Sequence, residues 1–193
     1  MKQTEITVQV KESEADLIKK LTEGGFNFER SFEMCDHYFT HIKDYKKASY
    51  ADLIKNSVLI RTITDEKTIS KIVYKDKQID CDGNVISEQK LSVKIDNAED
   101  AVKLFLSAGF YLWSTVKNYS KVFKNGEIEL CVQNISNLGL FIELEEYPSI
   151  STKNNNEKFE ILKQTLINLN IVTDSNFSAK KPYMILQKSI KGE

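Results

Sequence analysis

Residues 138–145 read Leu-Gly-Leu-Phe-Ile-Glu-Leu-Glu, and no other stretch says more about the architecture of this chain. Successive side chains of a β-strand point to opposite faces of the sheet. Ile142 and Leu144 therefore share one face, and Glu143 and Glu145 share the other. The stretch predicts a strand with an apolar side and an acidic side.

The same two-residue period puts polar or charged side chains on one face of three further predicted strands. These side chains are Thr7, Gln9 and Lys11 in the first, Arg61 in the third and Lys75 in the fourth. An ordinary half-exposed sheet would turn such a row to bulk water. A barrel covered on the outside by helices would turn it inward, onto a charged ligand. These two alternatives predict different functions.

Periodicity and turn signals divide the chain into strands and helices. Strands are predicted at 4–11, 28–40, 57–64, 68–75, 85–95, 112–123, 127–133 and 140–146. Three amphipathic helices are predicted: one after Ser13, one that begins at 96–99 and one over 159–169. A polar loop is expected at 43–55, a hairpin turn at Asp82-Gly83-Asn84 and a short apolar stretch at 183–186. This is an antiparallel α+β plan. Without a linker or a break in composition, we expect one domain over residues 1–193.

Composition limits the function classes. Lys and Arg number 27 against 28 Asp and Glu, so the formal charge of -1 creates no global field for nucleic acid or an anionic membrane. Any anion site must be local. The chain begins without an apolar signal-peptide core, and no apolar run approaches the roughly 18 residues of a membrane span. The three cysteines, Cys35, Cys81 and Cys131, are widely spaced and do not form the closely spaced pairs typical of metal ligands. We expect a cytoplasmic protein that binds neither DNA nor membrane.

Several segments, in this order, resemble the CYTH superfamily of triphosphate tunnel enzymes over roughly residues 4–187. The matching pieces are Asp36-x-Tyr38-Phe39, Leu59-Ile60-Arg61, Tyr74-Lys75, Gly109-Phe110, Val116-Lys117, 128–133 and 138–145. The resemblance implies an antiparallel eight-stranded closed β tunnel with three to four helices packed outside. It also implies a triphosphate held by Lys and Arg, with Mg²⁺ or Mn²⁺ held by carboxylates. Family members are triphosphatases and class IV adenylate cyclases.

The resemblance also suggests site residues. The candidate phosphate-binding residues are Lys11, Arg61, Lys75, Lys117 and Lys121. The candidate metal ligands are Glu129, Glu143 and Glu145, and the candidate catalytic residues are Glu143, Glu145 and Lys11. This chemistry is reasonable, because phosphate oxygens accept from fixed cationic donors and hard divalent cations prefer carboxylate oxygens.

The chain also departs from the family pattern. Where the family has Glu-x-Glu-x-Lys, this chain has Thr7, Gln9 and Lys11, and the family aspartate before the Leu-Gly turn is Gln133. Thr and Gln keep an oxygen ligand but remove charge, and affinity for a divalent cation depends on ligand charge. We therefore expect Mg²⁺ or Mn²⁺ to bind weakly, if at all.

Three functions stay open. The leading hypothesis is a protein that binds a triphosphate or nucleotide polyphosphate, with weak or lost phosphohydrolase activity. The alternative is an active divalent-metal triphosphatase or class IV adenylate cyclase, in which Glu5 helps the other acids. The third is a barrel kept as a scaffold for protein contacts. Arg61 could instead form a structural salt bridge, for example to Glu143 or Glu145. Monomer and homodimer are both compatible with the sequence.

Overall fold

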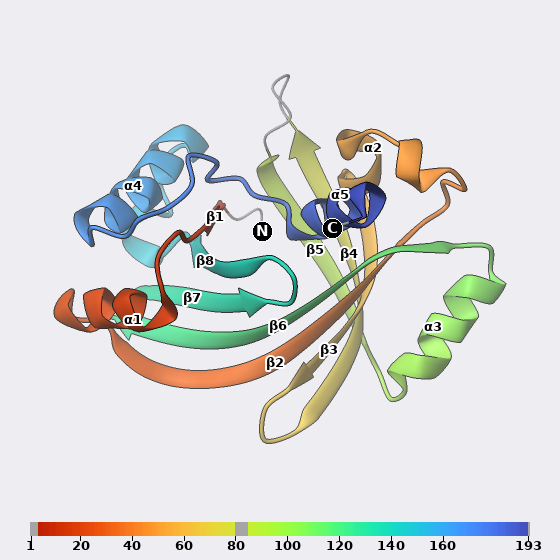
Figure 1. Cartoon of the computed structure of the whole chain (residues 1–193), viewed down its shortest axis with the longest axis horizontal. Coiled ribbons are helices and arrows are strands. Elements are labelled where there is room, and N and C mark those ends of the chain that lie inside the picture. Colours follow the sequence, from red (N-terminus) through yellow and green to blue (C-terminus); the bar gives the residue numbers. More distant parts are fainter. Residues whose placement is uncertain (1–3, 80–84, 193) are drawn as a thin grey trace.

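The computed structural model describes residues 4–79 and 85–192, and within them eight strands form one antiparallel sheet (Figure 1). The strands are β1 (Glu5–Gln9), β2 (Asn27–Thr40), β3 (Asn56–Thr64), β4 (Thr68–Ile79), β5 (Val85–Ile95), β6 (Tyr111–Asn125), β7 (Ile128–Ile135) and β8 (Gly139–Glu145). Their order across the sheet is β1-β8-β7-β6-β2-β3-β4-β5. The sheet curls into a half-barrel, which confirms the predicted α+β class.

The two edge strands, β1 and β5, show no backbone pairing with each other in the described part of the chain. The outer edge of β1 is occupied instead by the segment 172–179. Thr7 donates its N–H to the Phe177 carbonyl at 2.9 Å and accepts from the Ala179 N–H at 2.9 Å. The sheet is therefore a half-barrel whose edge strands are not joined by a ladder, and this segment, the C-terminal strap, lies along the outer edge of β1.

Five α-helices lie in the described ranges. They are α1 (Glu14–Glu23), α2 (Tyr50–Ile54), α3 (Ala98–Ser107), α4 (Asn155–Asn168) and α5 (Lys181–Lys191). The helices predicted after Ser13, at 98 and across 159–169 are confirmed, and Ser13 caps α1 by accepting from the Asp16 N–H at 3.2 Å.

Two segments contain a helix that the sequence did not predict, one at 43–55 and one at the C-terminal end. The stretch predicted as a polar loop at 43–55 contains α2, which buries Leu53 and Ile54. A five-residue helix is too short to show an apolar period, so the pattern alone did not indicate it. The short apolar stretch at 183–186 is the middle of α5. The hairpin turn predicted at Asp82-Gly83-Asn84 lies outside the described residues.

The two faces of β8 differ as the alternation in 138–145 predicts, although the concave side of the sheet also carries buried apolar residues, among them Leu59, Val116 and Phe141. Ile142 and Leu144 have no exposed surface and join Leu17 of α1 and Leu162 of α4 in one apolar cluster on the convex side. Figure 1 shows α1 and α4 beside the β1, β8 and β7 end of the sheet. Since helices cover the apolar row, the charged row lies on the concave side. This is the second of the two alternatives.

The Leu-Gly turn before β8 requires its glycine. Gly139 has φ of 90°, a left-handed conformation that residues with a Cβ adopt at a cost. This turn sets the start of β8 and with it the face on which Glu143 lies. No helix in the described ranges is long and apolar enough to cross a membrane.

Candidate functional site

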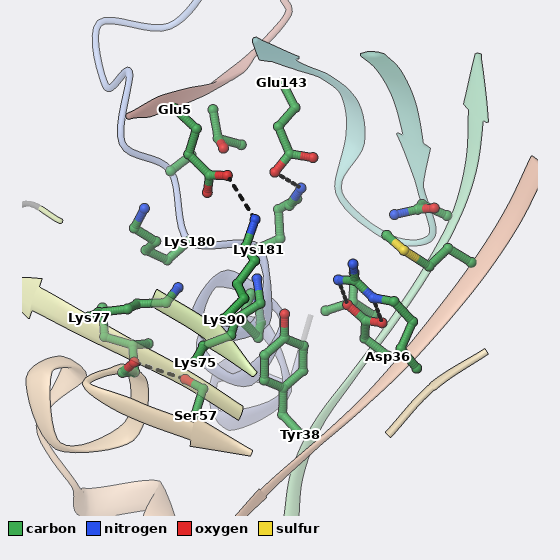
Figure 2. A pocket seen from close by; sticks show the side chains of 18 of the residues that line it. Glu5, Asp36, Tyr38, Ser57, Lys75, Lys77, Lys90, Glu143, Lys180 and Lys181 are labelled. Atoms are coloured by element: carbon green, nitrogen blue, oxygen red, sulfur yellow. Dashed lines mark hydrogen bonds and ion pairs between the residues drawn. The ribbon is translucent and has the colours of Figure 1, made fainter. Parts of the chain in front are cut away.

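A pocket of about 90 Å³ lies on the concave side of the sheet, beside the strap and the start of α5. Among the described residues, six cationic side chains line it: Arg61, Lys75, Lys77, Lys90, Lys180 and Lys181. Four acidic side chains also line it: Glu5, Asp36, Glu143 and Glu145. Figure 2 shows the labelled groups among them, such as Lys75, Glu143 and Lys181, pointing into one space from strands on opposite sides and from the α5 end. The lining is therefore densely charged, with an excess of cations.

Arg61 is held in place by Asp36, its partner across β2 and β3. The guanidinium donates from Nε to Oδ1 at 2.7 Å and from Nη2 to Oδ2, a two-point pair (Figure 2). Asp36 is only 2% exposed. Burial lowers the pKa of Arg61, but Asp36 and the carboxylate of Glu143 raise it more, so Arg61 stays charged. Its salt bridge is thus to Asp36, and the fork keeps further N–H donors for a ligand.

Three lysines surround one buried carboxylate. The Nζ atoms of Lys75, Lys77 and Lys90 lie 3.3, 3.0 and 3.3 Å from the carboxylate oxygens of Glu88 on β5. Burial raises the pKa of Glu88, but the three ammonium groups outweigh it and hold that pKa well below its usual range. Glu88 therefore stays ionised and fixes the lysines on one wall of the pocket.

Glu143 is held on the opposite wall. Gln133 donates from Nε2 to Glu143 at 2.7 Å, while Lys181 donates to the Gln133 Oε1 at 2.6 Å and lies 3.4 Å from Glu143. Burial raises the pKa of Glu143, but Lys181 and the more distant Lys75, Lys90 and Arg61 lower it to about 2. The carboxylate is thus ionised at neutral pH, and Gln133 fixes its orientation.

Lys180 differs from the other cations of the pocket. It makes no ion pair within the described part of the chain, and it lies on the same side of the pocket as Lys77 in Figure 2. Burial and the neighbouring Lys77 together lower the pKa of Lys180 to about 8, against the opposing effect of Glu5. A partly buried ammonium without a close counter-charge is suited to receive an anionic ligand.

Four of the residues suggested by the sequence lie together in this pocket. They are Arg61, Lys75, Glu143 and Glu145. Lys11 lies beyond the end of β1, where its Nζ is 3.1 Å from Asp174 and it does not line the pocket. Lys11 is thus paired at the surface.

Lys117, Lys121 and Glu129 also lie away from the pocket. On β6 it is Val116 and Asn118 that line the pocket, so Lys117 lies on the other face of the sheet. Lys121 shares that outer face and pairs with Glu14 of α1 at 2.7 Å. Glu129 is half exposed at the far end of β7, 3.9 Å from Arg30. Lys117 and Lys121 thus face away from the pocket because neighbouring residues of a strand lie on opposite faces of the sheet.

Several residues in or beside the pocket were not among the site residues that the sequence suggested. Lys77 lies two residues after Lys75 and so shares its strand face, and Glu88 and Lys90 share one face of β5. The two-residue period of a strand could therefore have predicted these three residues. Lys180 lies in the loop before α5, where no period exists. Its position depends on the strap along β1.

The carboxylates of the pocket do not fit a resident divalent cation. No group of three or more His, Cys, Asp or Glu side chains in the described ranges is arranged to hold a metal. The carboxylates of Glu5 and Glu145 are each 3.7 Å from the Lys90 ammonium, which lies between them. The carboxylate oxygens that could bind a metal ion therefore contact the ammonium group of Lys90 instead.

Comparisons with known proteins agree on the fold. No family model matches the chain. The protein named "Putative adenylate cyclase MJ0240", from Methanocaldococcus jannaschii, is 28% identical over 186 residues, which cover 95% of this chain and 98% of that protein. The PH1012 protein of Pyrococcus horikoshii has a TM-score of 0.72 at 19% identity, covering 95% of this chain and 99% of that one.

A second solved structure is similar over nearly the whole chain. The protein named "Putative adenylyl cyclase HpAC1", from Hippeastrum, is described as revealing a dominant triphosphatase activity and has a TM-score of 0.63 at 12% identity. The match covers 97% of this chain and 96% of that one. These solved structures share the fold of this chain, and the similarity to the Methanocaldococcus jannaschii protein extends over nearly the whole of both chains.

Proposed function

We propose that this protein binds a triphosphate, free or as part of a nucleotide, in the pocket on the concave side of the sheet. The single observation that carries the proposal is the convergence of six cationic side chains on one recess. A triphosphate carries several negative charges over a short length. Hydrogen bonds between charged partners contribute about 1.5–3 kcal/mol each, so several such contacts support binding.

The cations would have different parts in binding. Arg61 is oriented by Asp36 and can present a planar fork to two phosphate oxygens. Lys180 lacks a close counter-charge, so binding an anion there breaks no ion pair. Lys181 would have to leave Gln133 in part, and the lysines around Glu88 would share their charge between Glu88 and the ligand.

Turnover of the bound triphosphate is the second candidate, in line with the leading expectation that such activity is weak or lost. It is favoured by the names of the relatives, an adenylate cyclase and a triphosphatase. It is also favoured by Glu145, whose pKa is raised by burial and by Glu5 and Glu143, against the opposing effect of Lys90. A carboxyl group with a raised pKa can act as a general acid or base.

Calorimetric titration with tripolyphosphate and with ATP tests the proposal. The double variant Lys180→Met/Lys181→Met removes two adjacent cations from the pocket. Its matched control, Lys46→Met/Lys47→Met, removes two adjacent exposed lysines elsewhere. We expect at least tenfold weaker binding in the first variant and less than twofold change in the second. No binding to the natural chain, or equal effects of both changes, would contradict the proposal.

Phosphate release, measured with Mg²⁺ and with Mn²⁺, separates binding from turnover. A slow or absent rate supports a binding protein. A robust rate that Glu145→Gln abolishes supports the enzymatic candidate and makes the protein a triphosphatase. Formation of cyclic AMP from ATP, measured in the same samples, distinguishes cyclase activity from hydrolysis.

A further inference from the structure

Three carboxylates from three strands meet at a single ammonium group. The Nζ of Lys90, on β5, is 3.3 Å from Glu88, 3.7 Å from Glu5 on β1 and 3.7 Å from Glu145 on β8. The dashed contact between Glu5 and Lys90 in Figure 2 crosses the seam where β1 and β5 lack a backbone ladder. One lysine thus connects both edges of the sheet.

The charges around Lys90 explain why a cation belongs there. Glu5 and Glu145 are direct cross-strand partners, and two like charges at that position repel. Lys77 and Lys75 neutralise Glu88 from the other side but have no ion pair with Glu5 or Glu145 in the described residues. Lys90 is therefore the cation that offsets the acidic wall.

We propose that the Lys90 ammonium occupies the place among these carboxylates that a divalent cation would need, and makes triphosphate binding independent of Mg²⁺ and Mn²⁺. A divalent cation would need the carboxylate oxygens at about 2.0–2.6 Å, whereas they now surround an ammonium at 3.3–3.7 Å. A metal ion could enter only by displacing Lys90 from Glu5 and Glu145, because Glu88 is also held by Lys75 and Lys77.

The protonation of Lys90 is consistent with this role. Burial lowers its pKa, but the carboxylates of Glu5, Glu88 and Glu145 outweigh burial and the repulsion from Lys75, so the pKa is raised. The ammonium therefore persists across the neutral range. The inference about metal rests on these contacts alone, and only its consequence for the ligand rests on the proposed function.

Titration with Mn²⁺ in the absence of any phosphate compound tests the inference. The variant Lys90→Met removes the ammonium and keeps the length of the side chain. The matched control, Lys77→Met, removes an ammonium from the same Glu88 but none from Glu5 or Glu145. We expect Lys90→Met to bind Mn²⁺ at least tenfold more tightly than the natural chain and Lys77→Met to resemble the natural chain.

Two results would overturn the inference. One is tight Mn²⁺ binding by the natural chain that Lys90→Met does not improve, and the other is the absence of Mn²⁺ binding from both. Thermal unfolding of the natural chain gives a test that needs no variant. We expect its midpoint to be unchanged by millimolar Mn²⁺, and a clear rise would contradict us. Because these titrations contain no triphosphate, their outcome is independent of whether the proposed ligand is right.

Discussion

At the scale of single residues, the pocket depends on carboxylates kept ionised by neighbouring cations. The period in 138–145 was sufficient to predict that Glu143 faces away from the apolar core. Its partners could not be predicted, because Gln133 and Lys181 come from β7 and α5 and meet Glu143 only after the sheet curls. Likewise, Arg61 in an apolar strand indicated an anionic partner, but Asp36 was identified only from the pairing of β2 with β3.

The stability of the fold should depend on the charge of Glu143. Its pKa is about 2 in the folded chain against an ordinary 4.5, so its contribution is present above about pH 4.5 and is lost as pH falls towards 2. At about 1.36 kcal/mol per pKa unit, the contribution is on the order of 3 kcal/mol. Denaturant unfolding at pH 7, 4 and 3 should therefore show a smaller acid-induced loss in Glu143→Gln than in the natural chain.

An exposed acid provides the control for this experiment. Glu160→Gln, on the solvent side of α4, should keep the pH dependence of the natural chain. If Glu143→Gln also kept that dependence, the proposed ion-pair network around Glu143 would be wrong.

Binding of a triphosphate should take up a proton at Lys180. The pKa of Lys180 is lowered to about 8 by burial and by Lys77, and an anion beside it would raise that pKa. The complex then binds more protons than the empty protein, so affinity falls as pH rises above about 8, by up to about tenfold per pH unit. Calorimetry in buffers of different ionisation enthalpy measures this uptake. An unchanged pH dependence in Lys180→Met would count against the assignment.

At the scale of elements, the positions of the strands in the sequence were predicted better than the side of the sheet on which each side chain lies. Both rows of β6 are polar: Ser114 and Asn118 point inward, and Thr115 and Lys117 lie on the other face. Alternation identifies a face only where one row is apolar. The register with β2 decides between the faces, because Asp36 and Val116 are cross-strand partners and both line the pocket. That information is not local in the sequence.

A reversal of charge at Lys117 should therefore leave the ligand unaffected. Lys117 lies on the outer face, so Lys117→Glu should change tripolyphosphate affinity less than twofold. Fluorescence or calorimetric titration at moderate ionic strength measures this effect, since salt screens long-range contributions of surface charges. A tenfold loss would mean that β6 presents its other row to the ligand.

At the scale of the whole molecule, the C-terminal part lies along one edge of the half-barrel and packs against its concave side. The strap 172–179 follows the outer edge of β1, and α5 then contacts β6 through the bond from Ser114 to the Pro182 carbonyl at 2.8 Å. This arrangement carries Lys180 and Lys181 to the pocket. The sequence predicted the antiparallel sheet and its outer helices, because periodicity is local. The strap has no period, so its position depends on tertiary pairing with β1.

Ligand binding should reduce the motion of this strap. Amide hydrogen exchange reports local opening, which becomes less frequent when a ligand bridges a segment to the rest of the fold. We expect exchange across 172–187 to slow on addition of tripolyphosphate, whereas α3 on the far side should be unaffected. Equal exchange in both regions with and without ligand would show that the C-terminal lysines do not take part.

A crystal structure of the full chain grown with tripolyphosphate tests the central claim most directly. The account predicts connected density for the phosphates inside the half-barrel, within contact distance of Arg61, Lys75 and Lys180 and without a metal ion beside Glu5 and Glu145. Density only at the outer face near Lys117, or an empty pocket at saturating ligand, would contradict it.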